Sequence, residues 1–152
     1  MLDDIDAKIL DILQRNGRTK RNDLAEIVGL SLPSVSERLR KLEESGYIKG
    51  YVATVDPKMV GKDITAFIFV TLESSKYYPA FVEHALATDD ILECHAITGE
   101  GSHLIKIRTE NTLTLEKLLA KIQSWQGVAG TRTNVVLSSP KEQMRIKLNH
   151  IK

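Results

Sequence analysis

The chain has 152 residues, 42% of them hydrophobic, so it is long enough to bury a core as one domain or two small ones. Its 21 Lys and Arg almost balance 20 Asp and Glu, and this balance gives no global signal for nucleic acid or a membrane surface. The acidic N-terminus and the lack of an apolar run of about 18 residues argue against a secretory signal and a spanning helix. A single cysteine, Cys94, is consistent with a reducing compartment, so we expect a cytoplasmic protein.

The first thirty residues predict two helices joined by a tight bend. Apolar residues recur every three or four positions from Ile5 to Leu13, and the helix they predict ends at Asn16-Gly17. Thr19 is placed to cap a second, short helix with its apolar residues between 24 and 28. Gly29 can end that helix because glycine adopts the left-handed conformation easily.

A third helix is predicted directly afterwards. Ser31 offers a hydroxyl cap, Pro33 falls in the first turn, and apolar residues continue at helical spacing to Ser45-Gly46. The opposite face carries short hydroxyls and charges: Ser34, Ser36, Glu37, Arg38, Arg40 and Lys41. Such side chains suit the phosphate oxygens and base edges of a major groove, so this helix is the candidate recognition helix of a helix-turn-helix.

Acidic and basic residues are unevenly distributed along residues 1–50, although the net charge of this segment is zero. Four aspartates lie between residues 3 and 11, whereas residues 15–49 hold eight basic residues against five acidic ones. A short helix, a glycine turn and a capped helix with basic outward residues favour DNA binding. The alternative on this pattern alone is a helical bundle with a solvated charged face.

Many positions of this half match a known family in order: Leu2-Asp3, Asp6, Ile9-Leu10, Asn16-Gly17-Arg18, Leu24-Ala25, Val28-Gly29-Leu30-Ser31, Val35, Arg38-Leu39, Leu42-Glu43, Gly46 and Ile48. The order resembles the DNA-binding half of the Lrp/AsnC family of transcription regulators. The resemblance implies that the third helix enters the major groove of double-stranded DNA. By that motif we expect contacts from Ser31, Pro33, Ser34, Ser36, Arg38, Arg40 and Lys41, with Arg18, Lys20 and Arg21 nearer the phosphates.

The segment after the helices predicts a connection of restricted geometry. Residues 48–55 alternate in part and read as one extended strand, which turns at Asp56-Pro57. Residues 58–63 form a short polar connection. We therefore divide the chain into a helix-turn-helix domain over 1–48, a linker strand and connection over 49–63, a second domain over 64–140 and a tail over 141–152.

The second half predicts a β-α-β-β-α-β order. The expected elements are a strand from Ile64 to Leu72 covered on both faces, a helix opened by Pro79 with Phe81, Val82, Ala85 and Leu86 inward, strands over Ile91–Ile97 and Leu104–Thr109, a helix through Leu115, Leu118, Leu119 and Ile122 ending near Gly127, and a strand over Thr133–Leu137. This order predicts an α+β fold, a ferredoxin-like unit with a four-stranded antiparallel sheet and both helices on one face.

Such a sheet leaves one face bare. Two helices are too few to cover all the apolar side chains of the strands, which include Phe67, Phe69, Ile97 and Val136. We therefore predict that two chains pack sheet against sheet as a homodimer. This half resembles the effector domain of the same family, including Gly127-Val128 and the pair Thr131 and Thr133, so the resemblance covers essentially the whole chain. It also implies that four dimers can assemble into an octamer.

In the family, the turn between the central strands reads Thr-Gly-Asp-Tyr-Asp-Tyr and contributes to a small-molecule pocket between dimers, commonly for an amino acid. Here the turn reads Thr-Gly-Glu-Gly-Ser-His, without the second acid and both aromatics. Glycine backbone N–H groups and threonine hydroxyls can still bind a carboxylate. The predicted effector site comprises Gly99, Glu100, Gly101, Ser102, His103, Thr131 and Thr133; the alternative is a tight turn without a ligand.

The sequence predicts no catalytic residue, metal site or cofactor. Cys94 and His95 are neighbours on a strand and point to opposite faces. The other histidines (His84, His103 and His150) lack ligand spacing, Glu100 and Glu110 lack an acid/base partner, and no hydrolase or nucleotide motif occurs. We expect a nucleoid-associated transcription regulator. The alternatives are a DNA-organising protein with little effector control and, since relatives have been recruited to tetrapyrrole decarboxylation, an enzyme.

Overall fold

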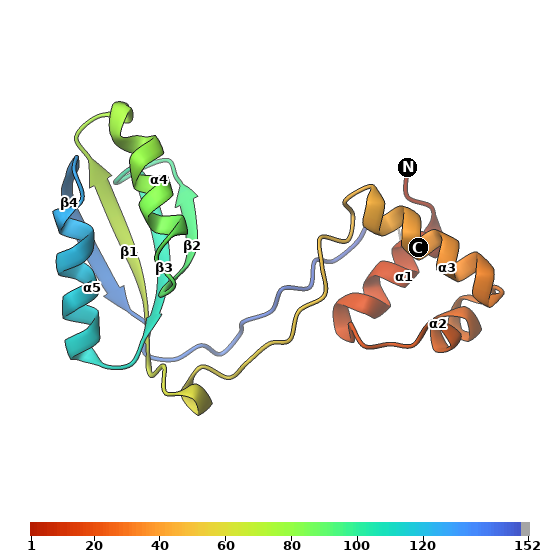
Figure 1. The fold of residues 1–152 in the computed structure, drawn as a ribbon. Helices are drawn as coiled ribbons and strands as arrows, with labels where there is room; N and C mark the ends of the chain where they lie inside the picture. Colours follow the sequence, from red (N-terminus) through yellow and green to blue (C-terminus); the bar gives the residue numbers. More distant parts are fainter. Residues whose placement is uncertain (150–152) are drawn as a thin grey trace. The chain divides into compact units, whose positions relative to one another are not determined.

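The structure, a computed structural model, describes residues 1–149, which form two compact units (Figure 1). The first unit comprises residues 1–54 together with the C-terminal segment from residue 141, and the second comprises residues 55–140. Among the residues described, no helix has the length and apolar character needed to cross a bilayer.

The first unit contains the three predicted helices, α1 (Asp4–Arg15), α2 (Arg21–Val28) and α3 (Leu32–Glu44). Each helix contributes one apolar stripe to a shared core, which comprises Ile9, Leu10, Leu24, Ala25, Val35, Leu39 and Leu42. Burial of these stripes stabilises helices that are too short to persist alone in water.

Local capping explains where these helices begin and end. Asp3 accepts a hydrogen bond from the backbone N–H of Asp6, and the Asp6 carboxylate accepts one from the N–H of Asp3, so α1 starts with a reciprocal capping box. Gly29, with a φ of 71°, ends α2. Ser31 caps α3 and Pro33 lies in its first turn, as the sequence predicts.

Two local predictions in this unit are wrong. Thr19 does not cap α2: the N-cap is Lys20, without a side-chain hydrogen bond, because the Thr19 hydroxyl donates instead to the carbonyl of Asn16 at 2.6 Å. Residues 48–55 do not form a strand, since no described segment of this chain pairs with them. Apolar side chains of this segment, such as Val52, are exposed.

The C-terminal segment lies against α1. Arg145 forms an ion pair with Asp11 at 3.0 Å. The Gln14 side chain donates to the carbonyl of Ile146 at 3.0 Å and accepts from its N–H at 2.6 Å. Leu148 packs against the helical core, so this segment is part of the first unit.

The second unit has the predicted ferredoxin-like order of elements. They are β1 (Ile64–Leu72), α4 (Tyr78–Leu86), β2 (Ile91–Ala96), β3 (His103–Thr109), α5 (Thr112–Ser124) and β4 (Val128–Val135), with short 3-10 turns η1 (Lys58–Val60) and η2 (Ser75–Tyr77). The strands lie in the order β2-β3-β1-β4, and all neighbours are antiparallel. The α+β fold class and the four-stranded antiparallel sheet are thus confirmed.

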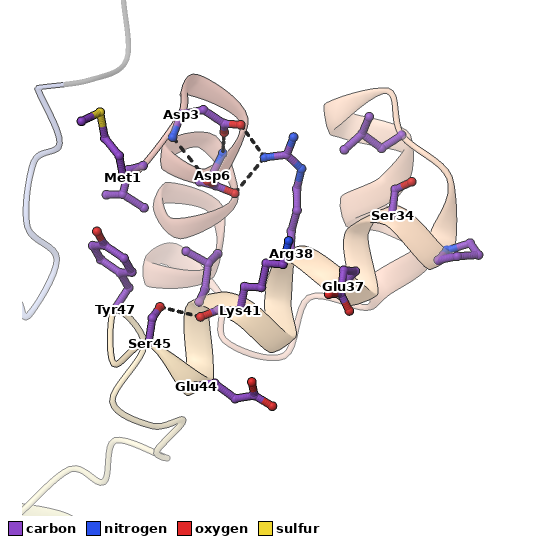
Figure 2. A pocket seen from close by; sticks show the side chains of 14 residues that line it. Met1, Asp3, Asp6, Ser34, Glu37, Arg38, Lys41, Glu44, Ser45 and Tyr47 are labelled. Carbon is purple, nitrogen blue, oxygen red and sulfur yellow. Dashed lines mark hydrogen bonds and ion pairs between the residues drawn. The ribbon is translucent and has the colours of Figure 1, made fainter.

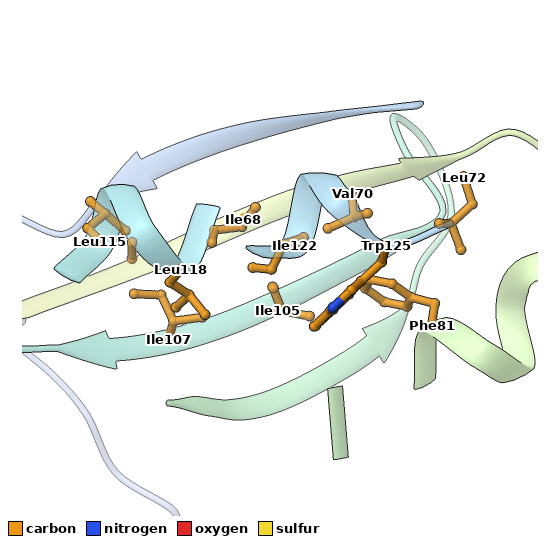
Figure 3. Close-up of a cluster of buried hydrophobic side chains, with 11 residues drawn as sticks. Ile68, Val70, Leu72, Phe81, Ile105, Ile107, Leu115, Leu118, Ile122 and Trp125 are labelled. Carbon is orange, nitrogen blue, oxygen red and sulfur yellow. The ribbon is translucent and has the colours of Figure 1, made fainter. Parts of the chain in front are cut away.

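Both helices cover one face of this sheet (Figure 1). Strand residues that alternate toward the helices, such as Ile68, Val70 and Ile105, are fully buried against Phe81 and Trp125 (Figure 3). On the opposite face, Phe67 and Phe69 of β1 are only half-buried. The predicted contrast between a covered and a bare face is therefore present in the single chain.

Two predictions about this unit are corrected. The last strand lies at Val128–Val135 rather than 133–137, because the backbone pairs with β1 directly after the turn at Gly127. Val82 and Leu86 do not point inward: they are 36% and 80% exposed, since the sheet covers only the stripe of α4 that carries Phe81 and Ala85.

Candidate functional site

The outward face of α3 holds most of the predicted contact residues. Ser31, Pro33, Ser34, Arg40 and Lys41 are exposed, and Ser36 is partly so. The Arg40 guanidinium is bound along the helix by Glu37, at 2.6 and 2.9 Å, and by Glu44 at 2.5 Å. Glu37 and Glu44 raise the pKa of Arg40, and the hydrogen bonds from Arg40 in turn lower the pKa of Glu37.

The predicted phosphate-contacting cations lie at the start of α2 and just before it. Arg18, Lys20 and Arg21 are all exposed. Arg21 donates to the hydroxyl of Ser36 at 3.4 Å, which brings the start of α2 next to the outward face of α3. The structure therefore places the cation of Arg21 beside an outward hydroxyl of α3.

Arg38 is placed differently from the other predicted contacts. It points toward two aspartates in an open hollow of about 1080 Å³ between the start of α1 and α3, which Pro33, Ser34 and Lys41 also line (Figure 2). One guanidinium nitrogen, Nη1, lies 2.7 Å from Asp3 and 2.9 Å from Asp6. Hydrogen bonds from the Asp6 backbone N–H and from Arg38 hold the pKa of Asp3 below its ordinary value.

The predicted effector residues are divided between two places. A shallow pocket of about 270 Å³ is lined by Phe69, Thr71, Glu100, Gly101, Gly130, Thr131 and Arg132. Of the predicted set it therefore includes Glu100, Gly101 and Thr131. Gly101 has a φ of 80°, and a Cβ there would lie 3.1 Å from the carbonyl oxygen of Val70, so the turn comes close to β1.

The remaining predicted effector residues do not line this pocket. His103 is buried between Tyr78 and Phe81, and its burial lowers its pKa. Ser102 donates through both N–H and hydroxyl to the carbonyl of Val70, and Gly99 lies in the exposed turn. Thr133 pairs with Ile68 in register, so its side chain is directed to the helix-covered face of the sheet.

Arg132 is a pocket residue that the sequence prediction missed. Its guanidinium lies 2.5 Å from the Glu100 carboxylate and 4.7 Å from the Phe69 ring centroid. Arg132 lies between Thr131 and Thr133 in the sequence, and this position alone does not indicate which face of the sheet its side chain takes. The pairing of β4 with β1 decides that face. The pocket thus presents one cation and one carboxylate beside an aromatic ring.

No group of three or more metal-ligating side chains occurs within residues 1–149. Cys94 packs toward the core, while His95 lies beside Glu93 at 2.9 Å on the other side of the strand. His84 stacks on Trp125. His150 lies outside the described residues.

Comparison with known families matches both halves of the chain. Residues 2–49 match a model described as winged helix-turn-helix DNA-binding. Residues 65–146 match a model described as the Lrp/AsnC ligand binding domain. The first match covers the three helices, and the second covers the sheet of the second unit and extends to residue 146 in the C-terminal segment.

Individual relatives resemble the chain over almost its full length. It is 37% identical over 142 residues to the HTH-type transcriptional regulator FL11 of Pyrococcus furiosus, covering 93% of each protein. It is 34% identical over 148 residues to the leucine-responsive regulatory protein of Escherichia coli, covering 95% of this chain and 90% of the relative. Among solved structures, a transcriptional regulator from Neisseria meningitidis in complex with L-Met superposes with a TM-score of 0.94 at 31% identity, covering 99% of both chains.

Proposed function

Because this chain belongs to the Lrp/AsnC family of transcription regulators, we propose that it binds DNA as a homodimer, with α3 of each copy in the major groove of one half-site. It is a DNA-binding regulator with a ligand-binding domain, not an enzyme. The observation that carries the DNA-binding geometry is the hydrogen bond from Arg21 of α2 to Ser36 of α3, which joins the exposed surfaces of the two helices.

We name this surface the recognition face and define it by Arg18, Lys20, Arg21, Ser31, Pro33, Ser34, Ser36, Arg40 and Lys41. The ion pairs of Arg40 do not argue against a DNA contact. Exposed pairs spaced three or four residues apart on a helix are worth only a few tenths of a kcal/mol. A phosphate oxygen can therefore replace Glu37 and Glu44 as the partner of Arg40 at little cost.

The bare face of the sheet supports the homodimer. Phe67 and Phe69 are half-buried there, and the cations of Lys106 and Arg132 lie over their rings at 6.0 and 4.7 Å. Aromatic side chains combined with arginine are typical of the centres of protein interfaces. A second copy related by twofold symmetry would bury the same residues on both sheets and present two recognition faces to DNA.

An amino acid is the proposed effector, bound at the pocket beside Arg132 and Glu100. A zwitterion carries the two charges that complement this pair: its carboxylate suits the guanidinium and its ammonium suits the carboxylate. The Neisseria relative was solved with L-Met, which supports an effector of this class. The turn lacks the second acid and both aromatics of the family's motif, and this difference favours the DNA-organising alternative, in which no effector acts.

DNA binding is tested by fluorescence anisotropy with a duplex selected from a random pool, at several salt concentrations. Replacement of Arg40 or Lys41 by alanine should weaken binding and lower the slope of log K against log salt by about 0.9 for each lost phosphate contact. Lys117→Ala, at an exposed position on α5, is the matched control. Unchanged affinity and slope in both variants would show that the recognition face is wrongly placed.

The homodimer and the effector need separate measurements. Light scattering on Phe69→Asp should report monomers where the wild type reports dimers or larger assemblies. Calorimetry against the twenty amino acids should give heat for the wild type and none for Arg132→Ala. If no amino acid produces heat or a melting shift, the effector proposal fails and weak sequence selectivity in the DNA pool would favour the DNA-organising function.

A further inference from the structure

Arg38 occupies a different side of α3 from Arg40. It follows Val35 by three residues and precedes Leu42 by four, and both of these are buried in the helical core. Residues with that spacing lie on one stripe of a helix. Arg38 therefore borders the packed stripe of α3, whereas Arg40 belongs to the opposite, exposed side.

The partners of Arg38 come from the start of α1, far away in sequence. Its Nη1 lies 2.7 Å from an Asp3 oxygen and 2.9 Å from an Asp6 oxygen (Figure 2). The same two aspartates form the capping box of α1. One guanidinium thus joins the middle of α3 to the two residues that begin α1.

The charges at this junction offset one another in large part. Two carboxylates carry two negative charges, and the Arg38 cation together with the partial positive charge of about +0.5 at the α1 N-terminus compensates most of them. The side chains of Arg38 and Asp6 are 29% and 17% exposed, so their hydrogen bonds are less screened by water than those of Arg40. A phosphate that bound Arg38 would break the link between α3 and the start of α1, whereas one that bound Arg40 would break only pairs within α3.

We infer that Arg38 is a positioning residue, whose guanidinium fixes α3 against the start of α1 and does not contact DNA. The inference rests on the proposed role of α3 as the recognition helix. It revises the sequence prediction, in which Arg38 is one of the contact residues. Its effect on DNA affinity is to hold the recognition face in one orientation before binding, which lowers the cost of ordering it in the complex.

Removing a carboxylate tests this inference, because the two roles predict opposite signs. If Arg38 contacted phosphate, Asp3→Asn would release it and remove a repulsive charge, so DNA affinity would rise. If Arg38 positions α3, Asp3→Asn weakens the junction and affinity falls. Asparagine caps helices about as well as aspartate, so the start of α1 is retained in this variant.

The experiment compares the wild type with Arg38→Gln, Asp3→Asn and the matched Arg40→Gln by anisotropy over a range of salt concentrations. We expect about a tenfold loss of affinity in Arg38→Gln, with an unchanged salt slope, and a loss in the same direction in Asp3→Asn. Arg40→Gln should lower the slope by about 0.9. The double variant Arg38→Gln/Asp3→Asn should lose less than the sum of the single variants.

Thermal unfolding of each variant separates altered orientation from lost folding, and Asp3→Asn alone carries the test if Arg38→Gln does not fold. Tighter binding by Asp3→Asn, or a lower salt slope in Arg38→Gln, overturns the inference while the proposed function stands. A wild-type chain that binds no duplex overturns both.

Discussion

The two units are stabilised in different ways. The second unit, residues 55–140, is called the ligand-binding unit below, and the first is called the DNA-binding unit. The ligand-binding unit has a core of alternating strand residues from β1 and β3, which two helices cover, and side chains such as Ile68 and Ile105 are fully buried. The DNA-binding unit has a smaller core, and polar contacts at its margin join its parts: Arg38 joins α3 to α1, and Gln14 joins the C-terminal segment to α1. We expect the stability of the ligand-binding unit to fall mainly when buried side-chain volume is removed, and that of the DNA-binding unit to fall mainly when hydrogen bonds are removed.

The largest effect should follow a cavity in the core of the ligand-binding unit. Ile105 lies on β3, which pairs with both β1 and β2, and it is 0% exposed. We expect Ile105→Ala to cost about 2–5 kcal/mol of unfolding free energy, since deleting buried methylene groups leaves a cavity that relaxes only in part. Urea unfolding followed by Trp125 fluorescence measures this loss in the ligand-binding unit.

Leu137→Ala is the control for this prediction, because that side chain is almost wholly exposed. Amide exchange in α1 and α3 should stay unchanged in Ile105→Ala if the units are stabilised separately. An equal loss of protection in both units would contradict the comparison.

A glycine in the ligand-binding unit provides the next largest effect. Gly127 has a φ of 89°, and a Cβ there would lie 2.2 Å from the ring of Tyr77. We expect Gly127→Ala to cost about 1–3 kcal/mol through backbone strain, and more if the ring cannot move. Gly130→Ala is the matched control three residues later, where a Cβ would meet open space. Equal urea midpoints for the two variants would refute the packing argument.

Local features of the fold could be predicted from the sequence. The caps at Ser31 and Gly29 and the strand Ile64–Leu72 depend on residues within a few positions, and all three are found as predicted. The strand predicted at 48–55 fails because strand formation needs a partner, which residue pattern alone cannot supply.

Features that depend on tertiary placement could be predicted only in part. The face taken by Arg132 depends on the register of β4 with β1, and the partners of Arg38 depend on where the start of α1 lies. The sequence did contain an indication of the second case. Arg38 follows Val35 by three residues and precedes Leu42 by four, and this spacing places it at the edge of the buried stripe of α3. Nothing in residues 145–148 alone indicated that they dock on α1.

A smaller effect is expected at the margin of the DNA-binding unit. Gln14→Ala removes both hydrogen bonds to the Ile146 backbone and should cost about 1 kcal/mol of stability in that unit alone. Gln14→Glu is the matched variant, because it keeps an acceptor for the Ile146 N–H but loses the donor. Amide exchange at Ile146 should be fast in the alanine variant and intermediate in the glutamate variant. Unchanged protection in both would show that the segment is held by other contacts.

The smallest effect is a pH dependence in the ligand-binding unit, at an exposed ion pair. A hydrogen bond from Lys62, 2.6 Å away, together with one from Thr109, lowers the pKa of Glu110 to about 2 from its usual 4.5. A folded-state pKa below the unfolded one stabilises the fold above pH 4.5, and this contribution disappears as the pH falls from 4.5 toward 2. Urea unfolding should therefore show Glu110→Gln less stable than the wild type at pH 6, with the difference vanishing near pH 2. Glu116→Gln, at an exposed position on α5, controls for the loss of a carboxylate. If Glu110→Gln differs from the wild type by the same amount at every pH, the stabilisation does not come from ionised Glu110.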